Sequence, residues 1–168
     1  MSDTRLRTRG HFVLWCRSPQ GKLQWKVGFH NGVTTAGCNG VLNAGFNAGT
    51  PSATWYVGLI SNASYTGVAS GDTHAAHAGW TEWTTYSGSN RPTWLPGPAT
   101  GGVLSTPVPF TWSITGAGAI RGAFLANVAA VGSVSPSGLL YCTAVMASGK
   151  AVNPGDTIHG TYILTIGN

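Results

Sequence analysis

The chain has 168 residues and a net charge of +5, yet only 8% of its residues are charged, while 42% are hydrophobic and 25 are glycine. Its length fits one domain that buries roughly two-thirds of the surface of the unfolded chain. No stretch approaches the roughly 20 continuous apolar residues that span a bilayer, and the charged N-terminus lacks the apolar segment of a secretory signal. So few charges predict that neighbouring proteins cover much of the surface.

Positive charge is concentrated near the N-terminus, where Asp3 is the only acid before Asp72. The first 26 residues hold six of the nine lysines and arginines, namely Arg5, Arg7, Arg9, Arg17, Lys22 and Lys26. We interpret residues 1–9 as a basic arm that binds an anionic partner, either nucleic-acid phosphates or an acidic protein surface. Spacing alone leaves open the alternative of a solvated tail with no binding role.

The first elements form a predicted β-hairpin. Residues 11–17 (HFVLWCR) and 22–29 (KLQWKVGF) are typical of strands, and the intervening SPQG is a turn of the proline and glycine type. From Lys22 to Val27, polar and cationic side chains alternate with apolar ones. This alternation predicts a half-buried strand whose outer face is basic.

Residues 33–46 form the one predicted helix, with Thr34 or Thr35 as its N-cap. The predicted packing stripe consists of Val33, Gly37, Val41, Leu42, Gly45 and Phe46. Glycines at positions 37, 40 and 45 weaken a helix by ~1 kcal/mol each relative to alanine. We therefore expect a short helix that lies on a sheet and is held there by packing.

Strand and loop patterns alternate in the middle of the chain. Residues 54–60 have apolar side chains on both faces, which favours a central strand. Residues 61–79 have turn composition, and so long a loop is commonly functional or part of an interface. Short strands follow at residues 80–86 and 93–97, where nearby prolines favour an edge or a corner.

The second half of the chain contains four more predicted strands, at residues 108–115, 116–128, 138–146 and 157–166. Alternation points one face of the first and last of these strands inward, with Val108, Phe110, Trp112 and Ile114, and with Ile158, Tyr162, Leu164 and Ile166. Residues 10–168 are therefore predicted to form a single all-β domain. The expected fold is a jelly-roll-like β-sandwich of about eight or nine strands with one short helix.

Aromatic side chains gather between residues 54 and 94, which hold four of the seven tryptophans. The row formed by Trp80, Trp83, Tyr86 and Trp94 is typical of a sugar-stacking platform or of a core and subunit interface. Together with the cations, this row gives the predicted partner-binding set: Arg5, Arg7, Arg9, Lys22, Lys26, Trp80, Trp83, Tyr86 and Trp94.

The sequence predicts no catalytic, cofactor-binding or metal-binding residue. His74 and His77 lie three residues apart, but only Asp72 stands near them as a further metal ligand. Asp72 and Glu82 are the one conceivable pair of catalytic carboxylates, and no motif supports them. The three cysteines are widely spaced, as expected of reduced thiols, and no nucleophile motif is present.

Four segments resemble a group of small virion proteins of tailed bacteriophages: WYVGLIS (55–61), DTHAAHAGWTEWTTYS (72–87), NRPTW (90–94) and PGDTIHGTYILTI (154–166). The resemblance implies a structural role in the virus particle, and these motifs are structural in kind. A charge-poor body with a basic arm favours a head cement (decoration) protein that clamps major capsid protein subunits. A tail or receptor-binding protein with a carbohydrate-binding aromatic surface is the alternative, although no stalk repeat is visible.

These interpretations lead to several expectations about partners. The chain is expected to bind major capsid protein and to form a homodimer or homotrimer, because closed symmetry is the usual way to cover such surfaces. We expect no enzymatic activity, no cofactor, no small-molecule ligand and no membrane association, and we favour a protein over a nucleic acid as the partner. The expected location is the capsid of a virion that is assembled in the host cytoplasm.

Overall fold

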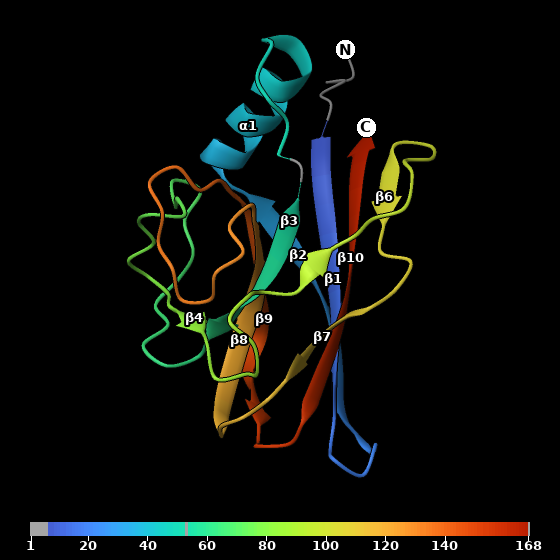
Figure 1. Ribbon diagram of the computed structural model, residues 1–168, viewed down its shortest axis with the longest axis vertical. Helices are drawn as coiled ribbons and strands as arrows, with labels where there is room; N and C mark the ends of the chain where they lie inside the picture. The colour runs from blue at the N-terminus through green and yellow to red at the C-terminus, as the bar shows by residue number, and fades with distance from the viewer. Residues whose placement is uncertain (1–6, 53, 168) are drawn as a thin grey trace.

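The computed structural model describes residues 7–52 and 54–167, and Figure 1 shows long antiparallel strands with one helix at the upper end of the molecule. The elements are β1 (Arg7–Arg17), β2 (Leu23–Val33), α1 (Thr35–Phe46), β3 (Trp55–Ser61), β4 (Glu82–Trp83), β5 (Thr93–Trp94), β6 (Val103–Ser105), β7 (Phe110–Ser113), β8 (Gly118–Ala126), β9 (Leu140–Val152) and β10 (Thr157–Gly167). The predicted all-β fold with one short helix is confirmed. The one strand that was not predicted is β6, which lies in a glycine-rich segment without a clear alternation of apolar and polar residues.

The strands pair from the two ends of the chain inward. β1 pairs with β10, β2 with β9 and β3 with β8, all in antiparallel register. The full order is β4-β3-β8-β9-β2-β1-β10-β6, with β5 beside β3 and β7 beside β10. β2 links the two halves of the sheet, because its residues up to His30 pair with β1 and its last residues, 31–33, pair with β9. Side chains of both halves then meet in one core, as expected of a sandwich.

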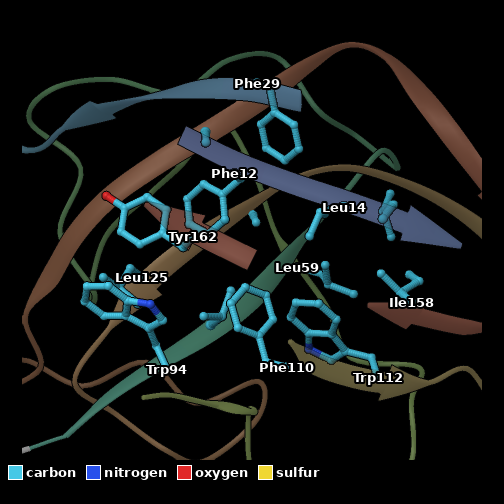
Figure 2. Packing of buried hydrophobic residues seen from close by; sticks show 14 of the residues in the cluster. Phe12, Leu14, Phe29, Leu59, Trp94, Phe110, Trp112, Leu125, Ile158 and Tyr162 are labelled. Atoms are coloured by element: carbon cyan, nitrogen blue, oxygen red, sulfur yellow. The ribbon is translucent and has the colours of Figure 1, made fainter. Parts of the chain in front are cut away.

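The main core lies between these halves (Figure 2). Phe12 of β1 stacks on Tyr162 of β10 and on Phe29 of β2, with ring centroids 4.2 and 5.8 Å away. Leu59 of β3 and Leu125 of β8 join the same cluster from the other half of the sheet. The pairing of the chain ends therefore builds one wall of the core directly.

β3 is buried on both of its faces. Leu59 packs in the main core, whereas Ile60, its neighbour in sequence, packs with Trp80 and Phe124 in a smaller second cluster. This arrangement confirms the prediction of a central strand at residues 54–60, which lies between β8 on one side and β4 and β5 on the other.

Two of the side chains predicted to point inward lie at the surface. Phe110, Trp112 and Ile114 are buried, but Val108 is 76% exposed because β7 begins only at Phe110. In β10 the inward residues are buried as far as Leu164, whereas Ile166 is 39% exposed at the end of the strand. The predicted alternation is correct in both strands, but the hydrophobic core covers only part of each run of alternating apolar residues.

The helix begins where the sequence predicts but packs on the sheet with a face formed by its small residues. The Thr34 hydroxyl oxygen accepts a hydrogen bond from the Gly37 amide at 2.9 Å, which confirms Thr34 as the N-cap. Gly37 is the buried residue of the helix, whereas Val41, Leu42 and Phe46 are 42%, 55% and 88% exposed. The predicted packing stripe is therefore wrong for its large residues.

The glycines explain which face of the helix packs on the sheet. A Cβ atom at Gly37 would collide with the carbonyl group of Tyr141 in β9, and one at Gly40 would collide with the side chain of Leu139. The helix approaches the sheet so closely that only small side chains fit between them. The large side chains are left on the opposite face.

The N-terminal boundary differs from the predicted one. Residues 7–9, assigned to an arm from the sequence, are the first residues of β1, and Arg7 and Arg9 pair with Gly167 and Thr165 of β10. Arg5 lies outside the described residues. Within the described chain, no helix has the length and apolar character needed to cross a membrane.

Substituting Gly37 tests the close approach of the helix. We expect Gly37→Ala to lower the free energy of unfolding by about 1–3 kcal/mol, because the added methyl group forces the helix away from Tyr141. Urea denaturation monitored by tryptophan fluorescence measures the change. Gly45→Ala is the matched control, since no atom lies within 4 Å of its Cβ position and alanine should stabilise the helix by up to ~1 kcal/mol. Equal effects of both substitutions would contradict the packing described here.

Candidate interaction surface

The outer face of the three strands β2, β1 and β10 carries the cationic side chains. Side chains alternate along β1, so the burial of Phe12, Leu14 and Cys16 leaves the odd-numbered residues on the outer face. The basic face, as we call it, comprises Arg7, Arg9, His11, Val13, Trp15 and Arg17 of β1, Lys26, Gly28 and His30 of β2, and His159, Thr161, Ile163 and Thr165 of β10.

Cations lie at both ends of this face. Arg7, Arg9, Arg17 and Lys26 are all exposed, and Lys26 lies directly opposite Trp15 in the register. The Arg17 guanidinium donates a hydrogen bond of 2.7 Å to the carbonyl of Gly21, which ties it to the turn between β1 and β2. The structure therefore gathers on one sheet the charges that the sequence divides between an arm and a hairpin. Lys22 is exposed beside that turn.

Aromatic rings lie between the cations. Trp15 stacks on His159 of the neighbouring strand, with centroids 5.4 Å apart and an interplanar angle of 13°. His11 and His30 form a second cross-strand pair, 4.8 Å apart. Burial and then the nearby charge of Arg17 lower the pKa of His159. His159 is therefore mostly neutral at neutral pH.

A shallow hollow lies at the hairpin end of the basic face. Its volume is about 280 Å³, and it is lined by Trp15, Arg17, Leu23 and Lys26. An aromatic face beside two cations suits a carboxylate or another anionic group that needs both charge and a flat apolar contact.

Every carboxylate side chain that the structure describes is buried. Asp72 accepts hydrogen bonds from the Trp80 indole and the Ala69 amide, both at 2.9 Å. Asp156 is 2% exposed and accepts from Gln24 and from the Asn153 amide. With Glu82 also buried, the fully charged groups exposed on the described part of the chain are all positive.

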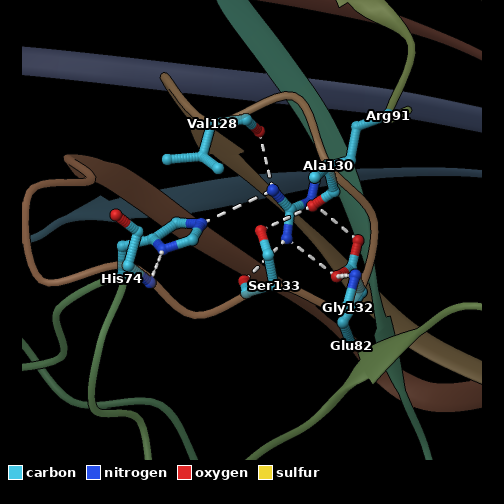
Figure 3. A network of polar contacts seen from close by, with 8 residues as sticks. His74, Glu82, Arg91, Val128, Ala130, Gly132 and Ser133 are labelled. Carbon is cyan, nitrogen blue, oxygen red and sulfur yellow. Dashed lines mark hydrogen bonds and ion pairs between the residues drawn. The ribbon is translucent and has the colours of Figure 1, made fainter. Parts of the chain in front are cut away.

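Glu82 belongs to a buried network around Arg91 (Figure 3). The two side chains form two hydrogen bonds of 2.8 Å each and are 7% and 2% exposed. Arg91 also donates to the carbonyls of Val128 and Ser133, and the Gly132 amide donates to Glu82. The network thus joins Glu82 of β4, Arg91 shortly before β5, and the loop after β8.

His74 lies at the edge of the same network. The Ser135 amide donates to its Nδ1 at 3.0 Å, and its Nε2 lies 3.4 Å from Nη1 of Arg91. Burial is the main cause that lowers the pKa of His74, and the charge of Arg91 adds to it. His77 is engaged with the carbonyl of Trp80 through Nδ1.

A hollow of about 250 Å³ lies beside this network, lined by residues that include His74, His77, Glu82 and Arg91. The described residues contain no cluster of three or more histidine, cysteine or carboxylate side chains that could hold a metal ion. Asp72 and Glu82, the conceivable catalytic pair, each accept several hydrogen bonds from the protein. The arrangement stabilises the loops by charge pairing.

The burial of the aromatic row agrees with its interpretation as core and does not agree with a sugar-stacking platform. Trp80, Tyr86 and Trp94 are 3%, 6% and 4% exposed, and the Trp94 indole donates to the Thr106 hydroxyl inside the molecule. Trp83 is half-buried and covers Gly118, where a Cβ atom would meet its ring. These rings have no shared exposed face, because each fills space under a loop or between strands.

Sequence reasoning did not single out Trp15, Arg17 and the histidines of the basic face as binding residues, and it gave Arg91 no role of its own. The signal for the face was present, since Arg7, Arg9, Trp15 and Arg17 are all odd-numbered. The predicted boundary between an arm (residues 1–9) and a domain (residues 10–168) separated these residues and concealed their shared face. Arg91 had no comparable signal.

Comparison with known protein families and with curated proteins finds no match for this chain.

The buried ion pair should be costly to break. We expect Glu82→Gln to lower the free energy of unfolding by about 3 kcal/mol or more, because it leaves the Arg91 charge buried without a compensating carboxylate. Chemical denaturation measures the loss. The double variant Glu82→Leu with Arg91→Met, which removes both charges, should be less destabilised than Glu82→Gln, and a larger loss in the double variant would refute this account.

The protein should become less stable as the pH is lowered, because of His74. The pKa of His74 is lower in the folded state than its ordinary value of about 6.5, so below about pH 6.5 the unfolded chain binds more protons than the folded one. The stability that His74 contributes above this pH is therefore lost as the pH falls toward the folded-state pKa. We expect the free energy of unfolding to decrease between about pH 7 and pH 5. His74→Asn keeps an acceptor for the Ser135 amide and should flatten this slope. Parallel profiles for the two proteins would rule out His74 as the cause.

Proposed function

We propose that this chain is a virion structural protein, a capsid cement (decoration) protein that binds major capsid protein and stabilises the head by non-covalent contacts. Its copies act in the capsid of a virus assembled in the host cytoplasm, and no bond is made or broken. The observation that carries the proposal is the separation of charge: the described carboxylates are buried, and exposed cations line one sheet face.

The basic face suits attachment to a large acidic surface. A strand rises about 3.3 Å per residue, so the row from Arg7 to Arg17 extends over roughly 33 Å. Fixed cations spaced along a rigid sheet favour a partner with many carboxylates over a single small ligand. Weak contacts of this kind become effective on a shell, because each copy meets a repeating array of identical sites.

A protein partner agrees better with the face than a nucleic acid does. Single-stranded nucleic acids bind to several aromatic rings on which successive bases stack. Trp15 is the one tryptophan on the basic face, and it is already stacked on His159. The alternative of a tail or receptor-binding protein with a sugar platform is weakened because Trp80, Tyr86 and Trp94 are buried.

Charge reversal on the basic face tests the proposal. We expect the double variant Arg9→Glu with Lys26→Glu to bind capsids of the virus that encodes the chain at least about tenfold more weakly at low salt, with a smaller difference at high salt. Cosedimentation with capsids stripped of the protein measures the affinity.

Lys150→Glu is the control for non-specific charge effects, because Lys150 lies on β9, outside the basic face. It should bind nearly as the unmodified chain does. The proposal fails if the unmodified chain does not bind the capsids, and attachment through the basic face fails if the double variant binds as tightly as Lys150→Glu. Binding that soluble sugars abolish would favour the receptor-binding alternative.

A further inference from the structure

Helix α1 presents its apolar side chains to the solvent. Cys38, Val41, Leu42, Gly45 and Phe46 follow the spacing i, i+3, i+4, i+7 and i+8, so they form one stripe along the helix, and all five residues are exposed. We call them the α1 stripe. Phe46, at 88% exposure, is the most exposed of the large apolar residues in the described chain.

The orientation of the helix is built into the packing beneath it. Gly37 and Gly40 lie against Tyr141 and Leu139, and larger side chains at these positions would collide with them. A helix that used its large apolar residues to bind its own sheet would need the opposite distribution of residue sizes. The stripe is therefore apolar surface that the fold leaves for another molecule.

A hollow adjoins the stripe. Its volume is about 410 Å³, and its lining includes Val41 of the stripe together with Ala44, Pro51, Trp55 and Leu139. The lining contains no charged side chain. Asn43, Thr50 and Ser52 also line it, so an apolar side chain from a partner would find an uncharged and largely apolar depression directly beside the exposed face of the helix.

Charge decides which partner suits this surface. Residues 27–71 contain no aspartate, glutamate, lysine or arginine, so the stripe and the segment of chain that carries it have no acidic, lysine or arginine side chain. The net charge of the chain is +5, and two copies that met through their basic faces would repel each other. Two copies that met through α1 would bring no like charges together, whereas an acidic partner would gain nothing from this face.

We infer that the α1 stripe is a self-association surface, whose occupant is the α1 stripe of a second copy of this chain related by a two-fold axis. Such an interface is isologous, so a neutral apolar stripe complements itself. Gly45 lets the two helices approach closely, and the side chain of Phe46 from one copy can enter the hollow of the other. For its biological purpose the inference rests on the proposed function, since cement proteins act as neighbouring copies on a shell.

The size of the surface sets the expected affinity. A helix of 12 residues is about 18 Å long, which is less than the span of a standard interface that buries about 800 Å² per partner. We therefore expect a dimer with a micromolar dissociation constant in solution, which neighbouring binding on a shell would strengthen.

Sedimentation velocity over a concentration series of about 1–200 µM, at high salt to screen the net charge, measures self-association. We expect a monomer–dimer equilibrium for the unmodified chain and at least a tenfold weaker dimer for Phe46→Glu. Val108→Glu is the matched control, because Val108 is 76% exposed but lies outside the stripe, and it should dimerise normally. Circular dichroism verifies that each variant is folded.

Cross-linking tests the arrangement. Leu42 is the middle of the stripe, so Leu42→Cys in a Cys38→Ser background should form a disulfide-linked dimer under mild oxidation, and Val108→Cys in the same background should not. Cys16 and Cys142 do not interfere, since both are buried and burial raises their thiol pKa values to about 12 and about 11.

The outcomes separate this inference from the proposed function. A chain that stays monomeric at every concentration, or a Phe46→Glu variant that dimerises as well as the unmodified chain, overturns self-association through α1, while capsid binding is measured independently. If Phe46→Glu loses capsid attachment and the unmodified chain is monomeric, the stripe contacts the shell and the inference is wrong. A dimer that Phe46→Glu disrupts supports the inference even if capsid binding fails.

Discussion

The antiparallel pairing of β1 with β10 is the constraint on which the rest of the structure depends. It runs without interruption from Arg7↔Gly167 to Arg17↔Thr157 and joins the two ends of the chain. Because side chains alternate across a strand, this register places Phe12 and Leu14 in the core and Arg9 and Trp15 on the surface at the same time. A shift of one residue in β1 would bury its arginines, so the core and the basic face are specified together.

The loops at the other side of the molecule depend on a different interaction. Between β3 and β4, and between β8 and β9, the chain has little regular structure, so side chains add to the backbone hydrogen bonds of the turns. Arg91 supplies several of these side-chain hydrogen bonds by binding Glu82 and the carbonyls of Val128 and Ser133. A buried ion pair adds little net stability but strongly disfavours other arrangements of the loops, since each would strand a charge.

The sequence predicted the strands well because alternation is a local property. Residues 11–17 and 54–60 have patterns that leave little choice of structure, and the N-cap at Thr34 is equally local. For Trp80 and Trp94 the sequence left a core and a binding surface as alternatives, because their burial depends on contacts with Asp72 and with Thr106 that follow no periodicity. Hydrophobicity alone could not predict the orientation of α1, because the close contact of Gly37 with Tyr141 decides the packing.

The two exposed surfaces differ in what they allow. The basic face has one sign of charge, so it attracts acidic partners and repels other copies over about one Debye length, near 8 Å at physiological salt. The α1 stripe is neutral, so copies can approach there without that penalty. Under the proposed function, attachment and lateral association would therefore use separate surfaces. The burial of the described carboxylates makes this division possible, since exposed acids would let copies pair basic face to acidic patch in open-ended chains.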